Sequence, residues 1–215
     1  MSTHPYRRAL AALAAGAVLA LGTTACGDDP GPQDRTVEVS DTEHGVADVA
    51  FATDMVQHHA QALSMVDLTV GRDLDPEVEQ LAEAIRAAQG PEIEQMADWL
   101  TEWGEDVPET MRDHVNAGHD HGGVSAGEAL AESMEGMDTD MPGMMSADDM
   151  AALADAPDEE FRTRWLEMMV EHHEGAVEMA RTEQAEGRYR PAVELAVTIE
   201  RTQQTEIETM RGLLG

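Results

Sequence analysis

The chain has 215 residues, of which 44 are acidic and 13 are basic, and its net charge at pH 7 is −31. Such a charge repels nucleic acid and anionic lipid, so the composition excludes a polyanion as partner and favours the attraction of cations. A surface adapted to salt or to an acid-rich proteome explains the same charge. Only 3% of the residues are aromatic, so any core must be built from aliphatic residues and methionine.

Residues 1–25 have the features of an export signal. Arg7 and Arg8 precede an apolar run that ends at Leu21, and this run is shorter than the about 20 residues of a spanning helix. The segment before Cys26 resembles a lipobox, which predicts lipidation of Cys26 and a lipoprotein anchored to the membrane, facing outside the cytoplasm. The alternative is a free thiol in a secreted protein. Residues 26–44 are rich in Asp, Pro and Gly, which predicts a flexible tether.

A pattern Met-Val-x-His-His-x-x-Ala-x-x-Met occurs twice, beginning at Met55 and at Met169. The same offset, from residue 58 to residue 172, also aligns Gln89 with Gln203. These matches indicate an internal duplication of about fifty residues.

Each copy places its paired histidines on the apolar stripe of a helix. At about 100° per residue, Phe51, Met55, His58, His59, Ala62, Met65 and Val66 share one face in the first copy. Gln57, Ala60 and Gln61 are expected to point elsewhere. Trp165, Met169, His172, His173, Ala176, Met179 and Ala180 form the same stripe in the second copy. We therefore expect all four imidazoles to be buried.

A turn and a second helix follow each stripe. Asp75-Pro76 and Arg190-Pro191 are typical of helix starts. Residues 45–103 and 146–215 are thus expected to form two helical hairpins, the second preceded by a short helix that begins near Ser146. Neither hairpin can bury its stripe alone, so we predict an all-α four-helix bundle.

Glu92 and Glu206 fall within the apolar faces of the partner helices and match each other in the duplication. A buried carboxylate is costly unless it is paired. One interpretation is that each accepts a hydrogen bond from an imidazole and leaves its other nitrogen free for a metal. The other is that each side chain reaches the edge of a narrow bundle.

Residues 104–145 separate the copies and are expected to be irregular, because Gly and Pro interrupt them and they lack helical periodicity. Methionines in a polar segment gain no stability from burial, so we interpret this segment as a capture arm for soft metal. The alternative is a flexible linker. Its candidate accessory ligands are His114, His119, His121, Met137, Met141, Met144 and Met145.

Histidine with methionine favours copper, or silver as its soft analogue. A di-iron bundle would need Glu-x-x-His on two helices, and structural zinc would usually recruit cysteine; neither pattern occurs. We also find no nucleophile with a base, no phosphate loop and no dinucleotide motif, so we expect no enzymatic activity.

The segment from Met169 to Ala180, with Gly143 to Leu153 and Trp165 before it and Glu206 to Met210 after it, resembles the family called domain of unknown function 305. The resemblance covers about residues 46–214. It implies a ferritin-like four-helix bundle and, by analogy with CopM-like members, an exported protein that binds copper through Met and His. The copies differ where Ala60-Gln61 in the first corresponds to Glu174-Gly175 in the second.

Our leading hypothesis is copper sequestration at the cell surface, with no known protein partner. The first expected ligand set is Met55, His58, His59, Met65 and Met96. The second is Met169, His172, His173, Met179 and Met210. One alternative is a helical interaction module without metal, and a weaker one is a ferritin-like metal oxidase that uses Glu92 and Glu206 as ligands.

Overall fold

The computed structural model describes residues 38–116, 125–134 and 139–215, and these residues form seven helices. The four long helices are α1 (Val46–Asp67), α2 (Pro76–Trp103), α6 (Asp158–Glu186) and α7 (Arg190–Leu214). The three short helices are α3 (Met111–Asn116), α4 (Ala126–Ser133) and α5 (Ala147–Ala154). The expected export signal and Cys26 lie outside the described residues.

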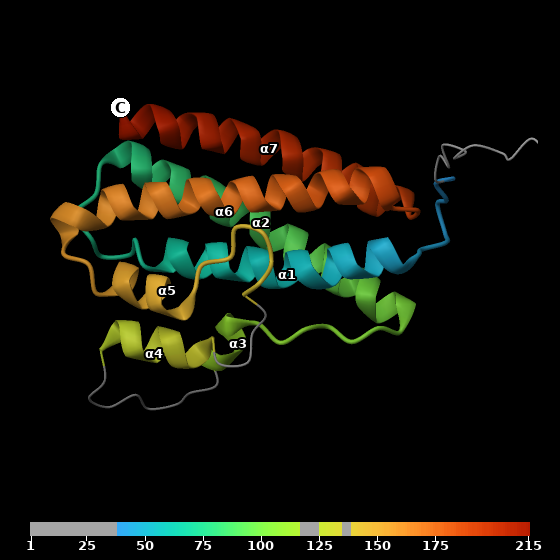
Figure 1. Ribbon diagram of the computed structural model, residues 1–215, viewed down its shortest axis with the longest axis horizontal. Coiled ribbons are helices and arrows are strands. Elements are labelled where there is room, and N and C mark those ends of the chain that lie inside the picture. Colours follow the sequence, from blue (N-terminus) through green and yellow to red (C-terminus); the bar gives the residue numbers. More distant parts are fainter. Residues whose placement is uncertain (1–37, 117–124, 135–138) are drawn as a thin grey trace, which may run out of the picture. The chain divides into compact units, whose positions relative to one another are not determined.

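The four long helices form two hairpins, as the duplication predicts. Helix α1 packs on α2, α6 packs on α7, and the hairpins meet mainly where α1 lies against α6 (Figure 1). The all-α fold and the pairing of two hairpins into a bundle are therefore confirmed. None of the helices in the described ranges is long and apolar enough to cross a membrane.

The sequence signals for helix starts agree with the helix bounds. Asp75 is the residue before α2 and Pro76 is its first residue, while α7 begins at Arg190 with a proline in its first turn. Gly71, in the turn between α1 and α2, has a φ of 83°, which a residue with a side chain rarely adopts. Helix α6 runs without interruption from Asp158 to Glu186, so the histidine helix begins before the stripe residue Trp165.

The segment between the hairpins is more regular than its composition suggests. We expected residues 104–145 to be irregular, but α3 and α4 lie within them. Ser125 accepts a hydrogen bond from the backbone of Glu128, and Ser146 caps α5 in the same way through Asp149. Local caps define these short helices, and hydrophobic periodicity over a long window does not detect them.

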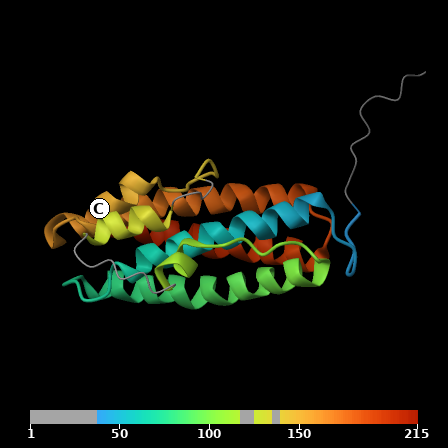
Figure 2. The same ribbon diagram turned by 90° about the horizontal axis from the view of Figure 1, so that it is seen from below.

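Helix α3 packs against α1 (Figure 2), and Gln61 of α1 is hydrogen-bonded to Met145 in the segment that precedes α5. Our expectation that Ala60 and Gln61 point away from the core is wrong, because their exposures are only 1% and 0%. A helix that is covered on both sides no longer has the solvent-facing stripe that helical periodicity assumes.

The expected tether ends earlier than residue 44. Ser40 forms an isolated bridge with Tyr189, in which the backbone of Ser40 exchanges hydrogen bonds with Arg188 and Arg190. The ring of His44 stacks on Trp103 with the centroids 4.5 Å apart. Residues 40–44 are therefore attached to the turn between α6 and α7 and to the end of α2.

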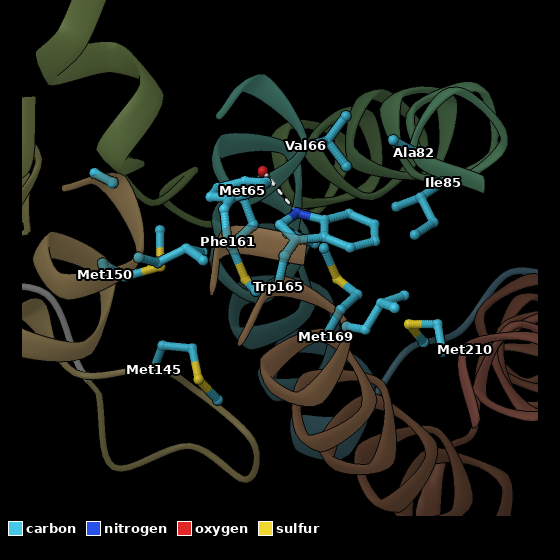
Figure 3. Packing of buried hydrophobic residues seen from close by; sticks show 14 of the residues in the cluster. Met65, Val66, Ala82, Ile85, Met145, Met150, Phe161, Trp165, Met169 and Met210 are labelled. Carbon is cyan, nitrogen blue, oxygen red and sulfur yellow. Dashed lines mark hydrogen bonds between the residues drawn. The ribbon is translucent and has the colours of Figure 1, made fainter. Parts of the chain in front are cut away.

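The buried apolar residues form two clusters, one toward each end of the bundle. One cluster includes Met65 from the first copy with Trp165, Met169 and Met210 from the second (Figure 3). The indole nitrogen of Trp165 donates to the carbonyl of Met65 at 2.9 Å. The other cluster includes Phe51, Met55, Met96, Ala180 and Ile199. Each cluster thus takes residues from both copies.

Candidate metal centre

A layer of polar side chains separates the two apolar clusters. Apart from Val177 on α6, the residues of the two clusters lie on opposite sides of these positions in the sequence of each long helix. We call this set the polar layer: His58, His59, Gln89, Glu92, His172, His173, Gln203 and Glu206. All four histidines have 0% exposure, as predicted from the stripe. Each copy supplies a His-His pair from one helix and a Gln-x-x-Glu pair from the next.

Two imidazoles of the polar layer are held by carboxylates of the partner helix. His59 Nε2 donates to Glu92 Oε2 at 2.7 Å, and His173 Nε2 donates to Glu206 Oε2 at 2.9 Å. The glutamate side chains keep 14% and 11% exposure, so each reaches an imidazole from near the edge of the bundle. Both interpretations of these glutamates therefore apply in part. With Nε2 as the donor, Nδ1 is the nitrogen of each of these two imidazoles that has no partner among the described residues.

The other two imidazoles face each other across the interface of α1 and α6. The ring centroids of His58 and His172 are 3.8 Å apart and the ring planes are inclined by 39°. Burial lowers the pKa of His58 to about 3, and the neighbouring His59 acts in the same direction. Burial also lowers the pKa of His172 well below 6.5, with a further contribution from His58. Both rings are therefore neutral at pH 7, which is the form that binds metals.

Several polar atoms of this layer have no hydrogen-bond partner among the described residues. They are the Nδ1 atoms of His58, His59 and His173, both ring nitrogens of His172, both amide atoms of Gln89, and Oε1 of Gln203. An unsatisfied buried polar atom costs about 1–3 kcal/mol. Neutral imidazoles with free lone pairs are suitable ligands for a borderline or soft metal, so the residues present fit copper. Within the described ranges, however, no three His, Cys, Asp or Glu side chains converge on one point.

The two expected ligand sets require the methionines of each copy to lie together, and the structure does not place them in this way. Met55 and Met96 lie in one apolar cluster with Met179 packed against it, whereas Met65 lies in the other cluster with Met169 and Met210. The reason is that α1 and α6 run in opposite directions, so positions after the His pair in one copy lie beside positions before it in the other (Figure 1).

The central segment contributes three of its predicted ligands to the described residues. Met145 is buried and Met141 and Met144 are half-buried, and all three lie in the segment that packs over α1 and α6 near His58. His119, His121 and Met137 lie outside the described residues, as does the side chain of His114.

A pocket of about 270 Å³ lies beside this segment, between α1 and α6. Its lining includes Pro142, Met179 and Glu183. Glu183 has 1% exposure, and burial together with the nearby Asp48 raises its pKa to about 9. Asp48 in turn accepts hydrogen bonds from the backbone nitrogens of Gly45, Arg188 and Tyr189. A protonated Glu183 beside Asp48 thus closes this end of the bundle.

Sequence reasoning did not include Gln89 and Gln203 among the site residues, although both have only 2% exposure and face the polar layer. The signal was available, because the duplication aligns them and each occupies an apolar stripe one turn before a glutamate. The pair of Glu183 and Asp48 had no such signal, because their contact joins helix positions that the repeat does not match.

Comparison with known proteins agrees with the fold. A DUF305 protein from Deinococcus radiodurans is 31% identical, with a TM-score of 0.60 over 80% of this chain and 97% of the other. A DUF305 protein from Streptomyces coelicolor, described as secreted, is 30% identical, with a TM-score of 0.61 over 78% and 91%. CopM in its Cu(II)-bound form is 26% identical, with a TM-score of 0.56 over 78% and 95%.

No curated protein matches the chain significantly. The sequence pattern of the domain of unknown function DUF305 matches residues 48–214, which include all four long helices except the first residues of α1. The chain therefore belongs to the DUF305 family.

Proposed function

We propose that the protein binds copper ions outside the cytoplasm and sequesters them, using the imidazoles of the polar layer. The observation that carries the proposal is the facing pair of His58 and His172, which is fully buried and neutral and has nitrogens without a partner among the described residues. Copper bound between the hairpins would satisfy buried atoms that otherwise destabilise the fold.

The similarity to CopM supports this choice of metal. CopM has been solved in Cu(II)-bound and Ag-bound forms, at 26% and 25% identity to this chain. Copper and silver are metals that accept imidazole and thioether ligands together. Met55, Met96, Met169 and Met210 border the polar layer in sequence and are fully buried, so thioethers are available on both sides of the imidazoles. In this proposal the protein holds the metal and catalyses no reaction.

The test is metal analysis and calorimetric titration of the purified protein with Cu(II), and with Cu(I) under reducing conditions. His58→Gln with His172→Gln should remove bound copper, whereas His44→Gln, outside the polar layer, should not. Copper should also raise the melting temperature, because a ligand that binds only the folded state stabilises it. An unchanged copper stoichiometry in the double variant would refute the site. A melting temperature that is the same with copper and with a chelator would favour the interaction module without metal.

We also propose that the protein is exported and anchored by a lipid on Cys26. The support is the apolar run that ends before a small-residue segment and the cysteine, together with the relative from Streptomyces coelicolor that is described as secreted. Cys26→Ser should move the protein from the membrane fraction to the medium. Membrane retention of that variant would contradict the lipid anchor.

A further inference from the structure

One short segment crosses the interface of α1 and α6 beside the facing imidazoles. We call residues Met141–Met145 the strap. The strap turns at Pro142 and Gly143, where the backbone nitrogen of Met144 donates to the carbonyl of Met141 at 3.1 Å. Gly143 has a φ of 73°, which favours glycine.

Helix α1 holds the strap through three hydrogen bonds. The amide of Gln61 donates to the carbonyl of Met145 at 3.0 Å, and its oxygen accepts from the nitrogen of Met145 at 2.7 Å. His58 Nε2 donates to the carbonyl of Pro142 at 3.0 Å. Gln61 has 0% exposure, so both of its bonds are shielded from water and costly to break.

Helix α6 holds the strap by close packing. A Cβ atom at Gly175 would lie only 2.0 Å from the carbonyl oxygen of Pro142. A Cβ atom at Gly143 would lie 2.7 Å from the carbonyl oxygen of Glu171. Only glycine at both positions allows the strap to approach the α6 backbone this closely.

Gln61 and Gly175 are equivalent positions in the duplication, since both lie three residues after the first histidine of a pair. A single strap cannot contact two symmetric helices in the same way. The first copy therefore forms hydrogen bonds with it through Gln61, and the second has a glycine, Gly175, that lets the strap backbone pack closely. The difference between Ala60-Gln61 and Glu174-Gly175 follows from this. The histidines differ accordingly: His58 has its Nε2 bound by the strap, whereas His172, its equivalent, has neither nitrogen bound among the described residues.

We propose that the strap positions His58, with Gln61 as the positioning residue, so that His58 presents Nδ1 as its only free nitrogen while His172 can present either. The Pro142 carbonyl accepts a hydrogen bond from Nε2 of His58, as Glu92 accepts one from His59 and Glu206 accepts one from His173. The consequence for copper rests on the proposed function, but the state of the His58 ring does not. Loss of such an outer partner typically lowers metal affinity by about 10–100-fold.

The test compares the wild type with Gln61→Met, which keeps a side chain of similar length but removes the two hydrogen bonds that Gln61 forms with the strap. Gly175→Ala displaces the strap from the other side and leaves Gln61 intact. Gln57→Met, one turn earlier on α1, is the matched control. Nitrogen-15 NMR of the histidine rings, on the full chain without metal, reports which ring nitrogen is protonated and how fast its proton exchanges.

We expect the Nε2 proton of His58 to exchange at least about tenfold faster in Gln61→Met and Gly175→Ala than in the wild type, which corresponds to loss of about 1.4 kcal/mol of protection. The Nε2 protons of His59 and His173 should not change, which distinguishes positioning from general destabilisation. Equal protection of the His58 proton in a folded variant would overturn the proposal. If the wild type shows the expected ring state but binds no copper, the proposed function fails while the role of the strap stands. If Gln61→Met binds copper as tightly as the wild type does, the strap has no role in the metal site.

Discussion

Mild acid should destabilise the metal-free protein through its facing imidazoles. The pKa of His58 is about 3 in the folded protein, and that of His172 is also well below 6.5, the value expected in the unfolded chain. As the pH falls below 6.5, the unfolded state therefore binds two protons that the folded state does not bind. Each histidine then lowers the free energy of unfolding by about 1.4 kcal/mol per pH unit, or about 4 kcal/mol for both between pH 7 and pH 5.

The measurement is urea unfolding followed by circular dichroism at pH 7 and pH 5 with a chelator present. Protonation of some of the 44 acidic residues also changes stability over this range, so the wild type must be compared with His58→Gln plus His172→Gln. The wild type should lose about 4 kcal/mol more than this double variant on acidification. His44→Gln serves as the control and should behave as the wild type. The reasoning is refuted if the double variant and the wild type lose equal stability.

Three further changes test other parts of the structure. Glu183→Gln should raise the free energy of unfolding at pH 8 but not at pH 4. The pKa of Glu183 is about 9 in the folded protein and 4.5 in the unfolded chain, so the wild type loses stability as the pH rises above 4.5, and the glutamine variant does not. A variant that is less stable than the wild type in urea unfolding at pH 8 would contradict this. Glu92→Gln should weaken copper binding by about 10–100-fold in calorimetric titration, while the exposed Glu94→Gln should not, and equal affinities would exclude a role for the bond to His59. Trp165→Phe should lower the free energy of unfolding by about 1–3 kcal/mol, because the carbonyl of Met65 loses its side-chain donor, and an unchanged urea midpoint would show that this bond contributes nothing.

The duplication was sufficient to predict the hairpins, the burial of the four histidines and the proximity of Glu92 and Glu206 to imidazoles. Each of these depends on positions within one hairpin, where helical spacing determines the face on which a side chain lies. The export signal and the lipid anchor remain predictions, because residues 1–37 lie outside the described part of the chain.

What sequence could not supply is the relation between the hairpins. The assignment of Met65 to the cluster of Trp165 and Met169 requires the direction in which α1 crosses α6. The burial of Gln61 requires knowledge that the strap lies on α1, and no periodicity within α1 reports a neighbour 84 positions away. Long-range packing thus determined the parts of the site that local patterns left open.

The sharing of both apolar clusters between the copies gives the bundle an internal two-fold relation. Each cluster needs residues from both hairpins, and the facing imidazoles are the same position of the repeat meeting itself. Such self-pairing is the mark of a two-fold symmetric dimer, in which each surface patch contacts its own copy. The two hairpins are therefore arranged within one chain as the subunits of such a dimer would be. The strap departs from this symmetry, because it forms hydrogen bonds with Gln61 on α1 but packs against Gly175 on α6.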